Sequence, residues 1–577
     1  MFWRRPACRK LRRLFDERWN ADLVIDECDS FDVKCELRME AAQRRIAVIM
    51  ATSDRGLLDI ERFDQEPHRP IFHGLAGDLN PAFLKGLTTE EKIPYVLQIL
   101  GQESISKRLR ASMIEIDQQI KTWPQLGSAV AYGAGCAAEV VRRLGLGEAI
   151  ASGRYFDDLD LLLNHVADPA IIGPQPAQPP GIPFNIRHAA KINPPNHQRV
   201  TFQQHGNQQV SGSRDTFHCK IRHIVSDAIL APSAANSQPW KWSLSGSTLT
   251  LRLDPNRTSD ALDYLNTGSL VALGAAAENL QLSAHVIGLP MVTQPFPEGS
   301  ASDIVARFLF DVGSPQQADS AWRSDLAPSI SLRHTNRSFR ERKILPDATL
   351  DALTAAVTSV NGARVQWITA EHQLDELAKL LGITDRLRNL NPIFHAELVR
   401  ELRWTPEEAL ATRDGIDIRS LDLSPSDLAG LRISCDSATL ALVREWNGGR
   451  NFEKMTARAV RSASAMGLIT MPSHGLADFF NGGRSVQRCW LTATAQHLAM
   501  WPMTALPYFF ARLFRGNGSL FQTDEQAELL ELRQRYERLF ELTKDEGEVL
   551  LFRIGIGETT SIRSLRRDVD DVFESVE

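Results

Sequence analysis

A proline-rich stretch, residues 173–216, constrains the fold of this chain more than any other feature. Its seven prolines come with glutamine, asparagine and glycine and with few apolar residues at regular spacing. This composition favours an extended linker or a strap along the surface over a packed core. It divides the 577 residues into an N-terminal module, 1–172, and a C-terminal module, 217–577. Each module is long enough to bury a core of its own.

Composition narrows the class of protein and its partners. Hydrophobic residues make up 43% of the chain and charged residues 24%, which predicts a globular protein in solution. A net charge of -6 argues against nucleic acid or an anionic membrane as the main partner. The basic residues between Arg4 and Arg13 precede no long apolar run, so we expect no signal peptide. Seven scattered cysteines without a C-x-x-C pair fit the cytoplasm and give no support for a metal site.

The first module opens with a strand, a helix and a second strand. Apolar residues run from 23 to 25, between Asp22 and Asp26, and again from 46 to 50, with a helical pattern between the two runs. This β-α-β order is typical of a parallel sheet, in which ligands bind at the carboxyl ends of the strands. Asp26 and Asp29 lie at such an end. They either face a nucleotide or a magnesium ion, or serve as a helix N-cap and a solvent-facing acid.

Residues Asp22 to Ser30, with the helix, the strand and Gly56–Asp59 after them, resemble the second half of the ThiF-type adenylating domain of the ubiquitin-activating superfamily. The resemblance implies that Asp29 helps to hold magnesium and ATP. The glycine-rich nucleotide loop of that family, with its arginine and lysine, belongs upstream of a strand that here begins at Asp22, and Ser30 replaces its asparagine. We therefore expect an incomplete adenylation site, either because the true start lies upstream or because the module has become a scaffold.

A polar loop between a helix and a hairpin carries the most specific motif of the second module. Pro232 ends the preceding helical pattern, and Ser233, Asn236 and Gln238 follow it before alternating residues predict the hairpin. Asparagine and glutamine side chains carry a donor and an acceptor at one end, which suits the edge of a flat heterocycle such as a flavin. The alternative is an ordinary capping loop with a buried tryptophan.

A second motif places Arg333 and Arg337 four residues apart, with Thr335 and Asn336 between them. In a helical turn or a tight bend, both guanidinium groups could reach one phosphate while the other two side chains add hydrogen bonds. The alternative is a solvated basic turn.

Two helical stretches rich in small residues, 268–287 and 482–495, read as a degenerate internal repeat. The half repeats span about 217–315 and 328–577. Within the second half repeat, a polar stretch from Arg400 to Leu431 is interpreted as an insertion, either a lid over the site or a peripheral helical excursion.

The Pro-Ser-x-x-Asn-x-Gln-Pro-Trp loop and the Arg-x-Thr-x-Arg element resemble the flavin-contacting elements of the nitroreductase family, in its Acg-like branch. In that family each flavin lies between two subunits, which supply one element each. Here the first half repeat has the loop and the second has the arginines, so we expect a fused pseudo-dimer with a single FMN. Relatives end with a strand and a basic segment that returns to the phosphate, which makes Arg563 and Arg566 candidate ligands.

The resemblance implies an FMN-dependent oxidoreductase that takes electrons from NAD(P)H and passes them to a small nitro, quinone or enone-like acceptor. The sequence assigns no catalytic acid or base. Two alternatives stay open: a protein that binds FMN without turnover, and a partner-binding or substrate-activating first module with an accessory flavin domain.

The expected fold class is a partial Rossmann-type α/β module followed by an α+β nitroreductase-like pseudo-dimer, an order that resembles the MoeY-like fusion proteins. The expected partners are a small-molecule substrate and, through the first module, a second copy of the chain.

Overall fold

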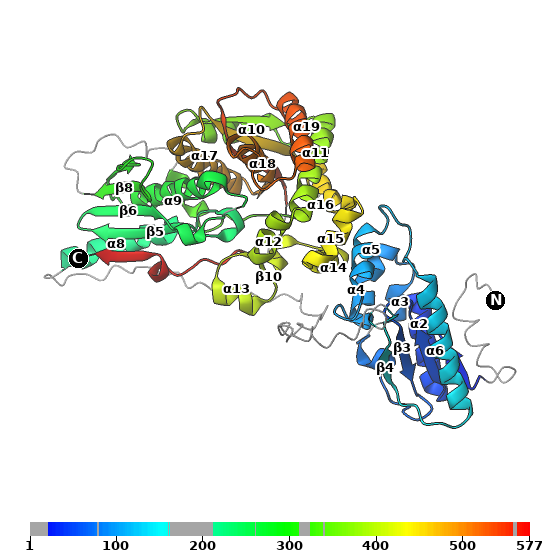
Figure 1. Ribbon diagram of the computed structural model, residues 1–577. Coiled ribbons are helices and arrows are strands. Elements are labelled where there is room, and N and C mark those ends of the chain that lie inside the picture. Colours follow the sequence, from blue (N-terminus) through cyan, green and yellow to red (C-terminus); the bar gives the residue numbers. More distant parts are fainter. Residues whose placement is uncertain are drawn as a thin grey trace, which may run out of the picture. The chain divides into compact units, whose positions relative to one another are not determined.

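The computed structural model describes residues 21–77, 80–159, 161, 212–259, 261–310, 324–338, 341–557 and 562–576. The chain forms two compact units (Figure 1). Unit 1 comprises residues 1–188 and 423–449, and unit 2 comprises residues 189–422 and 450–577. The N-terminal basic residues and the proline-rich segment up to residue 211 lie outside the described residues.

The sheet of unit 1 has four strands in the order β1-β2-β3-β4. They are β1 (Leu23–Ile25), β2 (Ala47–Ala51), β3 (Leu57–Glu61) and β4 (Gly153–Phe156). Strands β1 and β2 are parallel and flank helix α2 (Phe31–Arg44), as the β-α-β pattern predicts. The other pairs are antiparallel, so the sheet is mixed rather than parallel. The reason is local: a tight turn at Gly56, with φ 57°, joins β2 to β3, and such a turn can join only antiparallel neighbours.

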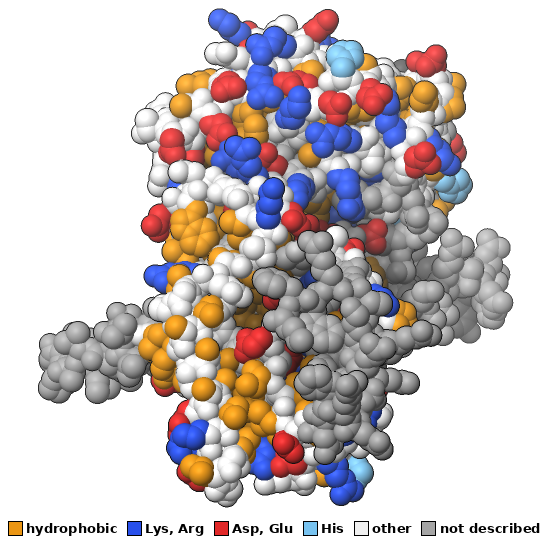
Figure 2. Space-filling model, turned by 90° about the vertical axis from the view of Figure 1, so that its right-hand side faces the viewer, with side chains coloured by type: hydrophobic (Ala, Val, Ile, Leu, Met, Phe, Trp, Pro, Cys, Tyr) orange, Lys and Arg blue, Asp and Glu red, His pale blue; other side chains and the backbone are white. Residues whose placement is uncertain are grey.

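Helices cover the sheet of unit 1 and extend beyond it. They are α3 (Pro81–Leu84), α4 (Thr89–Leu100), α5 (Lys107–Glu115) and α6 (Gly127–Gly145). Helix α6 packs against β2 and β3 through Ala137 and Val140. Apolar side chains also reach the surface of this unit, among them Leu126, Val130 and Leu146, and Figure 2 shows exposed hydrophobic side chains on the face that it draws.

Residues 423–449 return to unit 1, although the sequence boundaries place them in the second module. Their helices, α14 (Pro425–Ser434) and α15 (Ser437–Glu445), pack against α4 and α5 (Figure 1). Arg110 pairs with Asp436 at 3.2 Å, and the backbone N–H of Gly449 donates to Glu115 at 2.6 Å. A linear reading of the chain misses this packing because the partner helices lie about three hundred residues upstream.

Unit 2 contains two larger sheets. The first, in the order β15-β5-β6-β8-β7, contains β5 (Trp240–Ser245), β6 (Thr248–Leu253), β7 (Met291–Pro295), β8 (Ile304–Phe310) and β15 (Phe573–Val576). The second, in the order β13-β14-β12-β9, contains β9 (Arg364–Ile368), β12 (Ala465–Met471), β13 (Leu498–Pro502) and β14 (Gly547–Ile556). The C-terminal strand β15 runs parallel to β5, so the end of the chain returns to the sheet formed by its earlier half. The hairpin predicted after the polar loop is β5–β6, with Gly246 in its turn.

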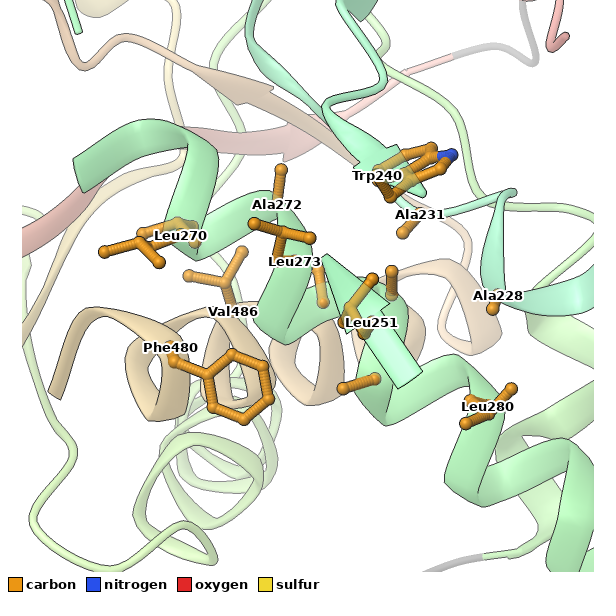
Figure 3. Packing of buried hydrophobic residues seen from close by; sticks show 14 of the residues in the cluster. Ala228, Ala231, Trp240, Leu251, Leu270, Ala272, Leu273, Leu280, Phe480 and Val486 are labelled. Atoms are coloured by element: carbon orange, nitrogen blue, oxygen red, sulfur yellow. The ribbon is translucent and has the colours of Figure 1, made fainter. Parts of the chain in front are cut away.

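Two long helices, α9 (Thr267–Val286) and α17 (Leu476–Ala495), pack against each other in the main core of unit 2. Figure 3 shows Phe480 and Val486 of α17 in the same apolar cluster as Leu270 and Leu273 of α9. Their backbones approach closely: a Cβ on Gly274 would lie 1.9 Å from the carbonyl oxygen of Phe480. These are the two small-residue helices that the sequence reads as a repeat, and glycine is what permits their contact.

The remaining helices of unit 2 are α8 (Gly212–Ala228), α10 (Asp347–Thr358), α11 (Glu371–Leu390), α12 (Pro392–Glu401), α13 (Pro406–Thr412), α16 (Arg450–Arg461), α18 (Ala505–Arg515) and α19 (Thr523–Leu539). Helices α11, α16, α18 and α19 share a second apolar core. The short strands β10 (Leu402–Arg403) and β11 (Ile416–Asp417) pair with each other. Within the described ranges, no helix has the length and apolar character needed to cross a membrane.

Candidate functional site

The polar loop after α8 has an unusual backbone. Ala235, Asn236 and Gln238 have φ values of 46°, 57° and 56°, in the left-handed region that residues other than glycine rarely adopt. The hydroxyl of Ser233 accepts a hydrogen bond from the backbone N–H of Gln238 at 3.0 Å and closes the loop. Pro232 is half-buried at its start. Such conformations persist where the surroundings fix them, and they are frequent at ligand sites.

Side chains of this loop bind the C-terminal segment. The Asn236 amide donates to the carbonyl of Leu565 at 3.0 Å, and its oxygen accepts from Arg566 at 2.8 Å. The Gln238 side-chain oxygen accepts from the backbone N–H of Arg567 at 2.9 Å. The structure therefore brings together the loop and the basic C-terminal segment, which the sequence predicts as parts of one site.

Arg566 and Arg333 converge on the turn that follows α8. Arg566 donates to the carbonyls of Ile229 and Ala231, each at 3.0 Å. Arg333 donates to the carbonyl of Leu230 at 2.8 Å, and its guanidinium lies 4.7 Å from the ring centre of Trp490. A third arginine, Arg563, donates to the carbonyl of Ser331 next to this pair at 3.0 Å.

Arg333, Arg563 and Arg566 form an arginine cluster in which, among the described residues, Arg333 and Arg566 have no compensating acid. Burial, together with the charges of Arg566 and Arg563, lowers the pKa of Arg333 well below its usual value. Burial lowers the pKa of Arg566 to about 10. Across the described residues no carboxylate acts on Arg333 or Arg566, and Nε of Arg333 donates no hydrogen bond. Buried charges are costly unless they are paired, so this cluster is chemically suited to an anion.

Arg337 lies apart from the arginine cluster. Its guanidinium donates to the carbonyl and hydroxyl oxygens of Ser420 at 3.2 and 3.3 Å, and burial lowers its pKa to about 10. Residues 333–338 are not helical, so side chains four apart need not point to one place. The structure thus does not place both arginines at one point, as a helical turn or tight bend would.

The residues between the two arginines have different settings. Thr335 is half-buried, and Asn336 is buried. The backbone N–H of Asn336 donates to Met500 on β13 at 3.1 Å, and its side-chain oxygen accepts from the N–H and hydroxyl of Ser338. In the structure, Asn336 shapes the turn that carries Arg337.

A strap, residues 402–421, contacts the polar loop and is part of the stretch that is interpreted from the sequence as a lid or a peripheral excursion. The carbonyl of Arg413 accepts from the Gln238 amide at 2.8 Å and from the Asn236 amide at 3.4 Å. Asp414 pairs with Arg257 at 2.7 Å and with Arg403 at 2.5 Å. The Asp414-Gly415 pair in the sequence indicates a turn, but the sequence does not show that this turn packs on the polar loop. Residues 402–421 thus contact the polar loop, whereas residues 423–449 pack in unit 1.

In unit 1, the two candidate acids do not form a joint site. Asp26 is buried in ion pairs with Arg38 at 2.5 Å and Lys34 at 3.2 Å, while Asp29 is exposed. Burial would raise the pKa of Asp26, but Lys34 and Arg38 outweigh it and lower the pKa to about 2. Arg38 also pairs with Glu61 at 2.5 Å. The N-cap of α2 is Ser30, so neither acid caps this helix, and Asp29 faces solvent. The residues described include no group of three or more His, Cys, Asp or Glu suited to a metal.

Comparison with known proteins places the chain in a family. MT1398 of Mycobacterium tuberculosis (strain CDC 1551 / Oshkosh), described as an uncharacterized protein, is 36% identical over 560 residues, which cover 95% of this chain and 71% of MT1398. The chain belongs to the MT1398 family. No family model matches the chain.

Part of this MT1398-family chain is similar to nitroreductases. Acg of M. tuberculosis, provisionally named an NAD(P)H nitroreductase, is 30% identical over 203 residues, 35% of this chain and 58% of Acg. The uncharacterized protein Rv3127 is 26% identical over 294 residues, 50% of this chain and 78% of Rv3127.

Two solved nitroreductases also match. The FMN-dependent nitroreductase NfnB from Mycobacterium smegmatis, in complex with NADPH, has 15% identity and a TM-score of 0.25, covering 44% of this chain and 99% of NfnB. A nitroreductase with bound FMN from Bacteroides fragilis has 10% identity and a TM-score of 0.22, covering 42% of this chain and 94% of its own.

Proposed function

We propose that unit 2 is an FMN-dependent oxidoreductase of the nitroreductase type, which takes electrons from NAD(P)H and passes them to a small nitro, quinone or enone-like acceptor. The observation that carries this proposal is the arginine cluster, in which Arg333 is buried, Arg566 is half-buried and Arg563 is exposed. Arg333 and Arg566 have no carboxylate partner among the described residues. A flavin phosphate carries the charge and the acceptor oxygens that guanidinium groups bind best. The similarity to Acg favours a flavin over other phosphate esters.

The polar loop would hold the flavin ring. Asn236 and Gln238 each offer an amide donor and acceptor, and both side chains already hydrogen-bond the segment that carries Arg566. Arg337, which lies apart from the arginine cluster, would bind a second edge of the cofactor. Because the loop comes from the first half repeat and Arg333 from the second, we propose one FMN per chain in an internally duplicated pseudo-dimer. The direct packing of α9 on α17 supports that arrangement.

The chemistry would come from the cofactor, since bound FMN accepts and donates hydride. The residues of this chain would bind and orient it. His334 does not add a charge to the site: burial, with the nearby Arg563 and Arg333, lowers its pKa, so the ring is neutral at pH 7. Its Nδ1 lies 2.9 Å from the carbonyl of Leu332, so the ring donates a structural hydrogen bond there.

A second candidate, FMN binding without turnover, is favoured by the strap. Residues 402–421 supply the Arg413 carbonyl to both amides of the loop and Ser420 to Arg337. Closure of this kind would restrict access of NAD(P)H and of acceptors to the cofactor. The two candidates share the FMN site and differ in whether NAD(P)H reduces the bound flavin.

For unit 1 we propose a scaffold or partner-binding role, with a second copy of the chain as one partner. The ion pairs of Asp26 support a scaffold role, because Arg38 and Lys34 hold this carboxylate in the core of the unit. Calorimetric titration with magnesium and ATP should show no binding. Light scattering of the full chain tests self-association.

The deciding experiment for unit 2 is a visible absorbance spectrum of the purified protein, with FMN added if needed, followed by anaerobic addition of NAD(P)H. One bound FMN per chain that bleaches supports the oxidoreductase. Bound flavin that stays oxidised supports the non-catalytic candidate. Failure to bind FMN after reconstitution would overturn both.

A further inference from the structure

A fourth buried arginine, Arg553, lies outside the arginine cluster, and neither the sequence motifs nor the proposed function uses it. It belongs to β14, an inner strand of its sheet, in a run that is otherwise almost entirely apolar. Its exposed fraction is 1%. Gly555, two residues on, leaves room beside its guanidinium. Arginine is rarely buried to this extent without an acidic partner, which suggests a specific role for Arg553.

The contacts of Arg553 point to the segment that carries the arginine motif. Nη1 donates to the carbonyl of Ser338 at 3.1 Å, and Nη2 donates to the hydroxyl of Ser462 at 3.1 Å. Nε makes no hydrogen bond within the described part of the chain. Burial lowers its pKa to about 10, which leaves the side chain charged at neutral pH.

Arg337 lies between two backbone anchors. On one side, the N–H of Asn336 donates to the carbonyl of Met500 on β13. On the other side, the carbonyl of Ser338 accepts from Arg553 on β14. The end of β14 also presses on this turn, because a Cβ on Gly557 would lie 2.9 Å from the Ser338 hydroxyl. The direction of the Arg337 side chain therefore depends on two adjacent strands.

We infer that Arg553 is a positioning residue for FMN binding, which acts by holding the Ser338 carbonyl so that Arg337 points into the cofactor site. This inference rests on the proposed FMN site. Arg553 need not touch the cofactor. Among the described residues, its guanidinium forms no ion pair with a carboxylate. Arg488, by contrast, is equally buried but pairs with Glu278 at 2.6 Å, as expected of an arginine that ties two helices together.

The test is a double-mutant cycle on FMN affinity, measured by quenching of flavin fluorescence, with the full chain and the variants R553M, R337M and R553M/R337M. Because R553M would act through Arg337, it should weaken FMN binding roughly tenfold or more in the wild-type background and have little further effect in R337M. In an R566M background, R553M should keep its full effect. R553K should not restore binding, since an ammonium group lacks the planar fork that spans Ser338 and Ser462.

Controls separate positioning from folding. R364M removes an arginine from β9 of the same sheet, where its side chain is 53% exposed, and should leave FMN affinity unchanged. Thermal unfolding of each variant without flavin shows whether it folds. An equal loss of affinity from R553M with and without Arg337 would overturn the inference and leave the proposed function intact. Absence of FMN binding by the wild type would instead overturn the proposed function, and this inference with it.

Discussion

Arg38 in unit 1 and Arg333 in unit 2 are both buried, but their surroundings are opposite. Arg38 lies between the carboxylates of Asp26 and Glu61, each at 2.5 Å, and its guanidinium is 3.9 Å from the ring centre of Phe72. Arg333 has backbone carbonyl and aromatic contacts, and the charges that act on it within the described residues are those of two other arginines.

The difference separates a structural arginine from a ligand-binding one. Charge neutralisation by two acids makes the Arg38 network a closed part of the core, in which nothing further is needed. The cluster around Arg333 instead holds uncompensated positive charge, and an anion would lower its free energy. By the same criterion Asp26, at the carboxyl end of a strand in a β-α-β unit, is a neutralised part of the core.

The largest effect should come from breaking the compensated network. Arg38→Met leaves the buried carboxylate of Glu61 without its cation and leaves Asp26 with Lys34 alone, so we expect unit 1 to lose about 3–5 kcal/mol of unfolding free energy in urea titration. Arg44→Met, on the same helix with a side chain 37% exposed, is the matched control and should change stability by less than about 0.5 kcal/mol. A loss of less than about 1 kcal/mol in the Arg38 variant would mean that water solvates the carboxylates that Arg38 contacts.

FMN should stabilise the uncompensated region. At a hundred times its dissociation constant, FMN should raise the unfolding free energy of unit 2 by about 2.7 kcal/mol. The transition of unit 1 should not move, because its buried charges are already paired. Calorimetric scans with and without FMN measure both. A shift confined to unit 1 would reverse the comparison.

Removal of one arginine of the cluster should weaken FMN binding. Arg566→Met should reduce FMN affinity by about 1.5–3 kcal/mol, the range for a hydrogen bond to a charged group, and should reduce riboflavin affinity much less. Arg252→Met, an exposed arginine that pairs with Asp303, serves as the control. Equal losses for FMN and riboflavin would show that Arg566 does not bind the phosphate.

The smallest effect is a pH dependence of unit 1. The ion pairs lower the pKa of Asp26 from 3.8 to about 2, so its charged form contributes stability above pH 4. That contribution, about 2 kcal/mol, should disappear as the pH falls from 4 towards 2. Asp26→Asn should be less stable at pH 5 and should lose less stability on acidification than the wild type. Parallel pH profiles for the two proteins would contradict the assignment.

Several local elements were predictable from the sequence. The β-α-β start of unit 1, the loop after α8 and its hairpin follow from apolar periodicity and from proline or glycine at their ends. The two small-residue helices were also found, because glycine and alanine at helical spacing are visible without knowledge of the partner helix. The resemblance to the nitroreductase family directed attention to Arg333, Asn236 and Gln238.

What the sequence could not provide is the pairing of distant groups. It did not show that Arg38 would neutralise Asp26, or that residues 423–449 would pack in unit 1. Nor did it show that Arg337 would hydrogen-bond Ser420, or that Arg333 would lie close to Arg566.

The sequence by itself determined where helices, strands and turns form, because these depend on residues within one or two turns of one another. Tertiary structure alone decided which buried charges are neutralised. Asn236 and Arg566 meet across 330 residues, and Asp26 meets Arg38 across a strand-to-helix connection. Electrostatic energy depends on distance in space and on burial, and neither can be read from the order of residues along the chain.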